Sequence, residues 1–305
     1  MKQAAELMAR VARVRQQARE REQAQQEQTE QAQRKAAPAP GSNVVRLPLW
    51  PEATRGVPNV ALRSALFGAI KKGARPYLEM AEIHAQDGIT IRYTGTRLDQ
   101  GDLDVWETVL HLTRAQPLGE SCRVTAYQLL KLLGKADTGG NREVLHRRLV
   151  RLRATALEVE CGNLSYIGGL IDEVAKERTS REYVIRLNPR LRVLFEDEEF
   201  TQLDWTVRQA LEGKPLAQWL HAFYASHAKP FPVKVETLHR LCGSGAVLLS
   251  DFKKDLRRNL NAVTEAGNAY GQPFSYVIVG ELVHVEKMPS STQRRHLARK
   301  AKGST

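Results

Sequence analysis

The feature that most constrains the fold is an order of elements that occurs twice along the chain. A helix, a short strand, a helix, a turn, a helix and a β hairpin are predicted from about Asp102 onwards, and the same order begins again near Val207. This is the order of a winged helix-turn-helix module. The chain is therefore predicted to be an α+β protein with tandem winged-helix (winged helix-turn-helix) domains, preceded by a flexible, partly helical N-terminal arm.

In the first series, Asp102 can cap a helix whose apolar side chains recur at helical spacing as far as Thr113. Gly134 then stops a second, short helix. The later elements of this series are predicted to be strand 122–125, helices 127–133 and 142–155, and strands 157–160, 164–174 and 183–187.

In the second series, the apolar spacing predicts a helix over 207–227 that is broken near Pro215. Gly280 and Glu281 mark the turn of a hairpin. The other elements are predicted to be strand 231–235, helices 236–241 and 248–266, and hairpin strands 274–279 and 282–285.

The ends of the chain differ from its middle in composition. Residues 1–40 are rich in Gln and Ala and contain no aromatic residue, so no packed core is expected there. The predicted organisation is an arm (1–42), an extended partner-binding linker (43–60), two winged-helix domains (61–200 and 201–288) and a basic tail (289–305).

The third helix of each series carries a basic face opposite its apolar stripe. In the first helix, Arg147 and Arg151 lie one turn apart on the face opposite Leu149, with Arg148 at the side. In the second, cations gather beside Asn261, and Asn can read adenine while Arg reads guanine in the major groove. A solvated charged face is the alternative. The predicted DNA contacts, including the first wing, are Arg142, Arg147, Arg148, Arg151, Lys176, Arg178, Lys253, Lys254, Arg257, Arg258 and Asn261.

Charge also favours a polyanionic partner, because 46 Lys and Arg outnumber 34 Asp and Glu for a net +12. The excess lies mostly at the ends: residues 1–40 carry +3, residues 287–305 carry +6, and the 246 residues between them carry only +3. Specific recognition must therefore depend on where a few cations fall on the two helices.

Several classes of protein are excluded by pattern. The sequence has no GxxxxGK[ST] phosphate loop, no HExxH and no His-x-His pair beside a tyrosine, so neither an enzyme nor a metal or cofactor site is expected. No apolar run reaches the roughly 18 residues of a transmembrane helix, and no secretory signal begins the chain. Three widely spaced cysteines fit small buried or half-buried thiols and a cytoplasmic protein.

Short motifs spread along the chain carry a family resemblance. These motifs are Arg63–Phe67, Ile91–Gly95, Leu152–Leu157, Ser226–Pro230, Lys234–Thr237, Cys242–Ser244 and Leu282–His284. Through them the sequence resembles the TrfA family of replication initiators of broad-host-range plasmids over about residues 43–286.

The resemblance implies binding to directly repeated origin sites (iterons), opening of the adjacent duplex, and recruitment of the host initiator DnaA and the DnaB helicase. Single-stranded origin DNA and a homodimer are further expectations. It also implies docking on the host β sliding clamp through a pentapeptide, here Arg46, Leu47, Pro48, Leu49 and Trp50, with Arg46 replacing the family's Gln.

The residues alone leave open whether this segment binds a partner or folds onto its own domain. A winged-helix transcriptional repressor is the main alternative function, and an origin nickase a weaker one.

Overall fold

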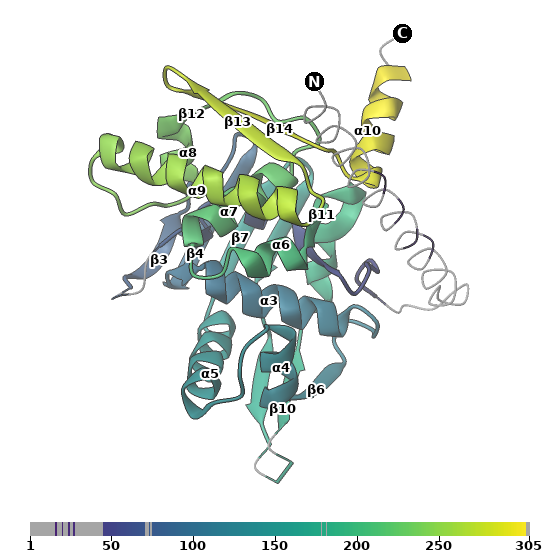
Figure 1. Cartoon of the computed structure of the whole chain (residues 1–305). Helices are drawn as coiled ribbons and strands as arrows, with labels where there is room; N and C mark the ends of the chain where they lie inside the picture. Colours follow the sequence, from purple (N-terminus) through teal and green to yellow (C-terminus); the bar gives the residue numbers. More distant parts are fainter. Residues whose placement is uncertain are drawn as a thin grey trace.

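The computed structural model describes residues 45–302 except 71–72, 74, 178 and 181, together with Gln16, Glu20, Ala24 and Glu27. The predicted arm, residues 1–42, therefore lies almost wholly outside the described residues. Within them the chain is a mixed α and β protein, and Figure 1 shows α3 (Gln100–Thr113) lying between two groups of helices and strands.

The first group contains most elements of the first predicted series, but the strands expected at 157–160 and at the start of 164–174 belong to a different sheet. The sheet order is β6-β10-β9, with β10 antiparallel to both neighbours, so the strand before the helix pair joins the hairpin after it. Helix α4 begins with a capping box between Thr125 and Gln128 and is followed by Gly134 at a φ of 69°. Besides α3, this group contains β6 (Ser121–Thr125), α4 (Ala126–Leu132), α5 (Gly139–Arg153), β9 (Glu173–Lys176) and β10 (Glu182–Arg186).

The second group repeats that arrangement. The sheet order is β12-β14-β13, so the first and last strands again pair. Pro215 opens α7, which gives the break expected between two helices. The elements are α6 (Trp205–Ala210), α7 (Pro215–Ala225), β12 (Val233–Lys234), α8 (Val235–Leu241), α9 (Leu249–Ala269), β13 (Phe274–Val279) and β14 (Leu282–Lys287), followed by α10 (Ser291–Lys302).

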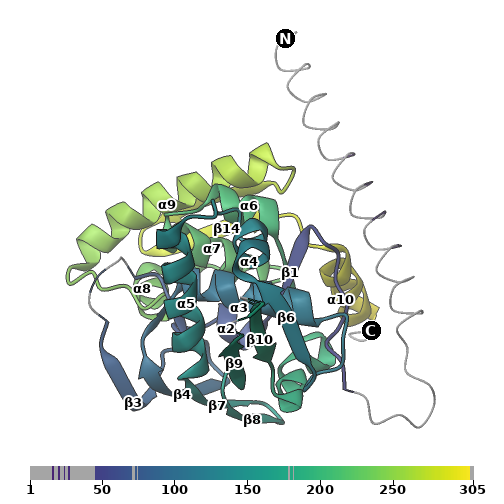
Figure 2. The ribbon, with the colours of Figure 1, turned by 90° about the horizontal axis from the view of Figure 1, so that it is seen from below.

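An antiparallel four-stranded sheet adjoins the first group, and Figure 2 shows its strands side by side. Its order is β3 (Tyr77–Glu82), β4 (Ile89–Thr96), β7 (Ala156–Cys161) and β8 (Leu164–Gly168). The remaining elements are the antiparallel pair β1 (Thr54–Pro58) and β11 (Phe200–Asp204), the parallel pair β2 (Phe67–Gly68) and β5 (Leu98–Asp99), α2 (Asn59–Leu62) and the 3-10 helix η1 (Pro189–Glu198).

Two of the expected elements are wrong in detail. The strand expected over 164–174 is divided between β8 and β9, which belong to different sheets, because Leu170 and Ile171 turn into the core between them. Helix α3 is capped by Asp99 and not by Asp102, which instead completes the capping box from inside the first turn.

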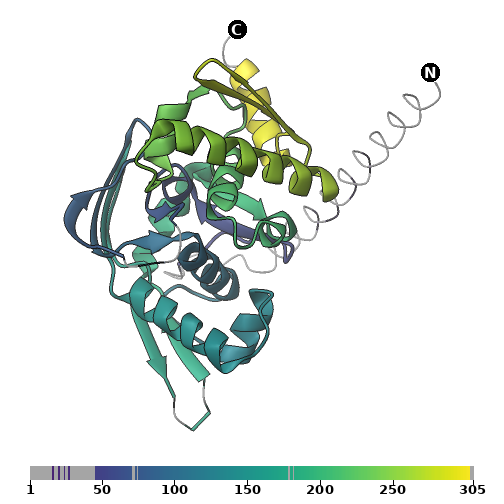
Figure 3. The ribbon, with the colours of Figure 1, turned by 60° about the vertical axis from the view of Figure 1, so that its left-hand side comes forward.

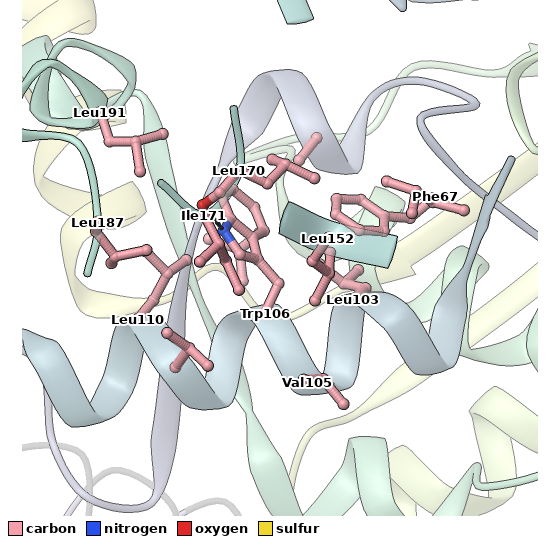
Figure 4. Close-up of a cluster of buried hydrophobic side chains, with 14 of the residues drawn as sticks. Phe67, Leu103, Val105, Trp106, Leu110, Leu152, Leu170, Ile171, Leu187 and Leu191 are labelled. Atoms are coloured by element: carbon pink, nitrogen blue, oxygen red, sulfur yellow. Dashed lines mark hydrogen bonds between the residues drawn. The ribbon is translucent and has the colours of Figure 1, made fainter. Parts of the chain in front are cut away.

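Buried apolar side chains form two clusters. In the first, Trp106 of α3 lies among leucines from distant parts of the chain and donates from Nε1 to the Leu170 carbonyl at 3.0 Å (Figure 4). The second is built on α7, α8 and α9, with Trp219 and Phe252 at its centre. Tyr93 and Tyr183 are core residues, and Cys242 is buried while Cys122 and Cys161 are half-buried.

A buried ionic network joins the two clusters. Arg208 of α6 is fully buried and pairs with Asp104 at 2.7 Å and with Glu107 at 2.6 Å, both on α3. Burial raises the pKa of Glu107 to about 7, although Arg208 opposes this shift. Because an unpaired buried guanidinium is costly, this network holds α3 and α6 in one relative position.

Candidate nucleic-acid interface

Helix α5 is held to the protein by the apolar stripe expected from the sequence. Leu145, Leu149 and Leu152 are buried against α3 and α4. The side chain of Thr138 caps the helix by accepting from the Asn141 amide at 3.3 Å. The helix therefore has one fixed face, and its other face is open to solvent.

The open face of α5 carries cations that can reach a ligand. Arg147 keeps 61% of its side chain exposed and pairs with Glu143 one turn earlier, at 3.3 Å. Arg142 is bound to Asp137 at 2.6 Å, also at the surface. Arg153, which the sequence reasoning missed, is exposed at the end of the helix. Exposed ion pairs contribute little stability, so these guanidinium groups can exchange carboxylates for phosphates or bases.

Arg148 and Arg151 were expected to face DNA, but the structure places both side chains in ion pairs with carboxylates at the start of α3. Arg148 lies 2.6 Å from Asp99 and 2.9 Å from Asp102, and Arg151 lies 2.6 Å from Asp102. Both side chains are only 20% exposed. Buried carboxylates at the start of α3 require counter-charges, and these two arginines with Arg75 supply them. Burial raises the pKa of Asp99, but Arg148 and Arg75 lower it to about 2.

Helix α9 presents the second basic face. Its buried stripe consists of Phe252, Leu256, Leu260 and Val263. Four of the predicted DNA contacts are exposed on this helix, of which Lys254 and Arg258 make i,i+3 pairs with Asp251 and Asp255 at 3.1 and 2.6 Å. The other two are Arg257 and Asn261. Within the described part of the chain, Arg257 has no ion pair.

Asn261 is oriented by the hairpin behind it. The hydroxyl of Tyr276 on β13 donates to Oδ1 of Asn261 at 2.7 Å, a contact that sequence periodicity alone does not reveal. Lys253 was also expected to contact DNA, but its Nζ donates to the Gly280 carbonyl at 3.1 Å and pairs with Glu281 at 2.5 Å. Lys253 therefore ties the hairpin turn to α9.

The two hairpin turns differ. In the first, the exposed Lys176 lies over the Tyr183 ring, 5.7 Å from its centroid, while Arg178 lies outside the described residues. In the second, Glu281 is neutralised by Lys253. Figure 3 shows α9 (green) lying above α5 (teal), with both helices on the near side of the molecule.

The segment 43–60 was expected to be an extended linker, but its described part, residues 45–60, contributes to the first core. Leu47 and Trp50 are each only 3% exposed. Trp50 stacks on Phe195 at 6.2 Å and donates from Nε1 to Nδ1 of His111 at 3.1 Å. Burial lowers the pKa of His111 to about 4, which keeps the ring neutral as this acceptor requires.

The polar and half-buried members of the pentapeptide are held as well. Arg46 donates to the Ala115 carbonyl at 3.0 Å, and Pro48 and Leu49 are half-buried. Strand β1 follows at once and pairs with β11. Leu47 and Trp50 are therefore not presented to a partner in this conformation.

Neither a membrane-spanning helix nor a metal-binding cluster is found among the described residues. No helix among the described residues is long and apolar enough to cross a membrane. The same residues contain no group of three or more His, Cys, Asp or Glu side chains that could hold a metal ion.

Comparison with known proteins identifies the family. A plasmid replication initiator protein TrfA of Escherichia coli is 31% identical over 218 residues, which cover 68% of this chain and 56% of that protein. The crystal structure of domains 2 and 3 of RctB matches with a TM-score of 0.52 at 13% identity, covering 76% of this chain and 98% of that one, so the likeness is one of fold. The TrfA protein family profile matches residues 3–286, and the chain belongs to that family.

Proposed function

We propose that this protein is a plasmid replication initiator that binds direct repeats in duplex origin DNA. The observation that carries the proposal is the repeated unit: two sheets with equivalent strand order each support a helix with a cationic outer face. The E. coli relative bears the name of an initiator, and the shared family makes that activity the first candidate here.

In this proposal each unit is a winged helix. The first consists of α3, β6, α4, α5 and the β9–β10 hairpin, and the second of α7, β12, α8, α9 and the β13–β14 hairpin. Helices α5 and α9 are then the recognition helices that enter the major groove. Two such helices can read successive major grooves, about 34 Å apart on one face of the duplex.

We assign DNA contacts to cationic side chains that are exposed on the two helices. These are Arg147 and Arg153 on α5, and Lys254, Arg257 and Arg258 on α9. Arg can bond guanine O6 and N7 or grip phosphate, and Asn261 can read adenine. Lys176, Arg178 and Arg142 are proposed as phosphate contacts at the edges.

Origin opening and host recruitment are part of the same proposal. A chain that lacks a phosphate loop has to use DNA-binding free energy to destabilise the duplex, and host proteins such as DnaA and DnaB would then act on it in the cytoplasm. Docking on the β clamp requires residues 46–50 to leave the core first. An isolated peptide of residues 44–51 should therefore compete for purified clamp more strongly than the intact chain does.

The test uses a duplex that the protein itself selects from a random library. Arg257→Ala and Arg258→Ala should each weaken binding to it and reduce the slope of log affinity against log salt by about one. Arg192→Ala, which removes an exposed arginine from η1, is the matched control and should leave the slope unchanged. Slopes equal to wild type in both α9 variants, with folding intact, would refute this interface.

A repressor remains the second candidate, favoured by one observation. Leu47 and Trp50 are buried, so the pentapeptide is not available to bind a clamp in this conformation. A repressor does not need to bind a clamp. Replication of a plasmid carrying the selected sites, in cells supplying this protein in trans, separates the two functions. An initiator supports replication, while a repressor occupies the sites and does not.

A further inference from the structure

An exposed apolar run precedes and opens α9. Val247 is 96% exposed, Leu248 59% and Leu249 38%. Three consecutive large apolar residues in solvent are unusual in a chain whose other apolar residues mostly fill two cores, and such groups mark interaction sites.

The loop that carries this run is fixed in place. The Ala246 amide donates to Oγ of Ser244 at 3.2 Å, and the Ala246 carbonyl lies 2.9 Å from Nε2 of His239. His239 in turn packs against Phe252 in the second core, with ring centroids 4.8 Å apart. Val247 and Leu248 therefore extend from an anchored backbone and are not a frayed end.

Helix α9 lacks the side-chain N-cap that stabilises the equivalent helix, α5, of the first unit. The N-cap of α9 is Leu248, which offers no side-chain oxygen to the helix amides, whereas α5 is capped by Thr138. Before α5 the surface is polar, with Asp137 bound to Arg142. The second unit thus places leucine and valine where the first places an acid and a hydroxyl.

The position of the run selects its partner. It directly precedes the turns of α9 on which Lys254, Arg257 and Arg258 are exposed. A polyanion held by those cations would cover the run. When a recognition helix docks, its N-terminal residues contact base edges, and the thymine methyl is the apolar group that a base pair presents in the major groove.

We propose that Val247 and Leu248 read thymine methyl groups in the half of the site bound by α9. This inference rests on the proposed DNA-binding function and adds the chemistry of its specificity. The two units then recognise bases differently: α5 with Arg147 through hydrogen bonds, and the start of α9 through apolar contact.

The probe is the selected duplex with each thymine in turn replaced by deoxyuridine, which removes only the methyl group. Wild-type protein should lose about fourfold in affinity at one or two thymines and show no change elsewhere, the effect expected for burying one methyl. Val247→Ala or Leu248→Ala should bind the thymine duplex more weakly and should no longer distinguish thymine from uracil at those positions.

Ile167→Ala, which removes a 70% exposed apolar side chain from β8, is the control and should keep the full methyl effect. Wild-type protein that binds the duplex but is indifferent to every methyl overturns this proposal and leaves the DNA-binding function standing. The proposal is also overturned if the methyl effect persists unchanged in both variants, or if both variants bind the duplex like wild type. Absence of any duplex binding refutes the proposed function itself.

Discussion

Replacing Trp50 by alanine removes the largest side chain of the pentapeptide from the first core. A buried tryptophan covers roughly 150–250 Å² of surface, which at about 25 cal/mol per Å² gives an upper estimate near 4–6 kcal/mol. Large-to-small substitutions of aromatic core residues cost about 3–5 kcal/mol. The same substitution removes the Nε1 donor to His111 and the stack on Phe195. We therefore expect Trp50→Ala to destabilise the protein by about 3–5 kcal/mol.

The measurement is thermal unfolding followed by circular dichroism at one fixed protein concentration. At about 2–4 °C per kcal/mol for a unit of this size, the midpoint should fall by roughly 6–20 °C. Leu49→Ala is the matched control, because Leu49 is only half-buried in the same segment, and a much smaller shift is expected. A change below about 1 kcal/mol for Trp50→Ala would show that the segment does not pack in solution and that the clamp peptide is free.

Two further predictions concern the charged residues. Arg148→Ala and Arg151→Ala should each lower the free energy of unfolding by about 3 kcal/mol or more in urea titrations, because each removes a counter-charge from buried carboxylates. Arg147→Ala should instead weaken DNA binding and change the free energy of unfolding by no more than about 0.5 kcal/mol. Equal effects of the three substitutions on stability would contradict the assignment. The stability that Asp99 contributes is present above its ordinary pKa and should be lost as pH falls from about 4 to 2, since its folded pKa is lowered. His111, with its folded pKa lowered to about 4, should cost stability as pH falls from about 6.5 to 4, because only the unfolded ring gains a proton there. Midpoints of thermal unfolding between pH 2 and 7 test both, and a flat profile would refute them.

Local patterns predicted much of the fold. Apolar spacing located α5 and α9 to within a few residues and identified their buried stripes, because a helix that packs on one side shows this in its own sequence. Gly280 and Glu281 correctly marked the β13–β14 turn. The order of elements in both units followed from these local signals.

What the sequence did not predict depends on contacts between distant residues. Arg148 looks like any surface arginine until Asp99, 49 residues earlier, is placed beside it. Trp50 lies between two prolines in a stretch that is typical of a linker, and its cover comes from distant residues: Phe195 of η1, Phe200 of β11 and His111 of α3. The pairing of β4 with β7 spans more than 60 residues and has no local signature.

The most direct test of the central claim is a hydroxyl-radical footprint on the selected duplex. If α5 and α9 read successive major grooves, the wild-type protein protects two segments about one helical turn apart on one face of the DNA. Arg147→Ala should then weaken protection of one segment and Arg257→Ala that of the other. A single protected segment, or two segments that both variants weaken equally, would contradict the account.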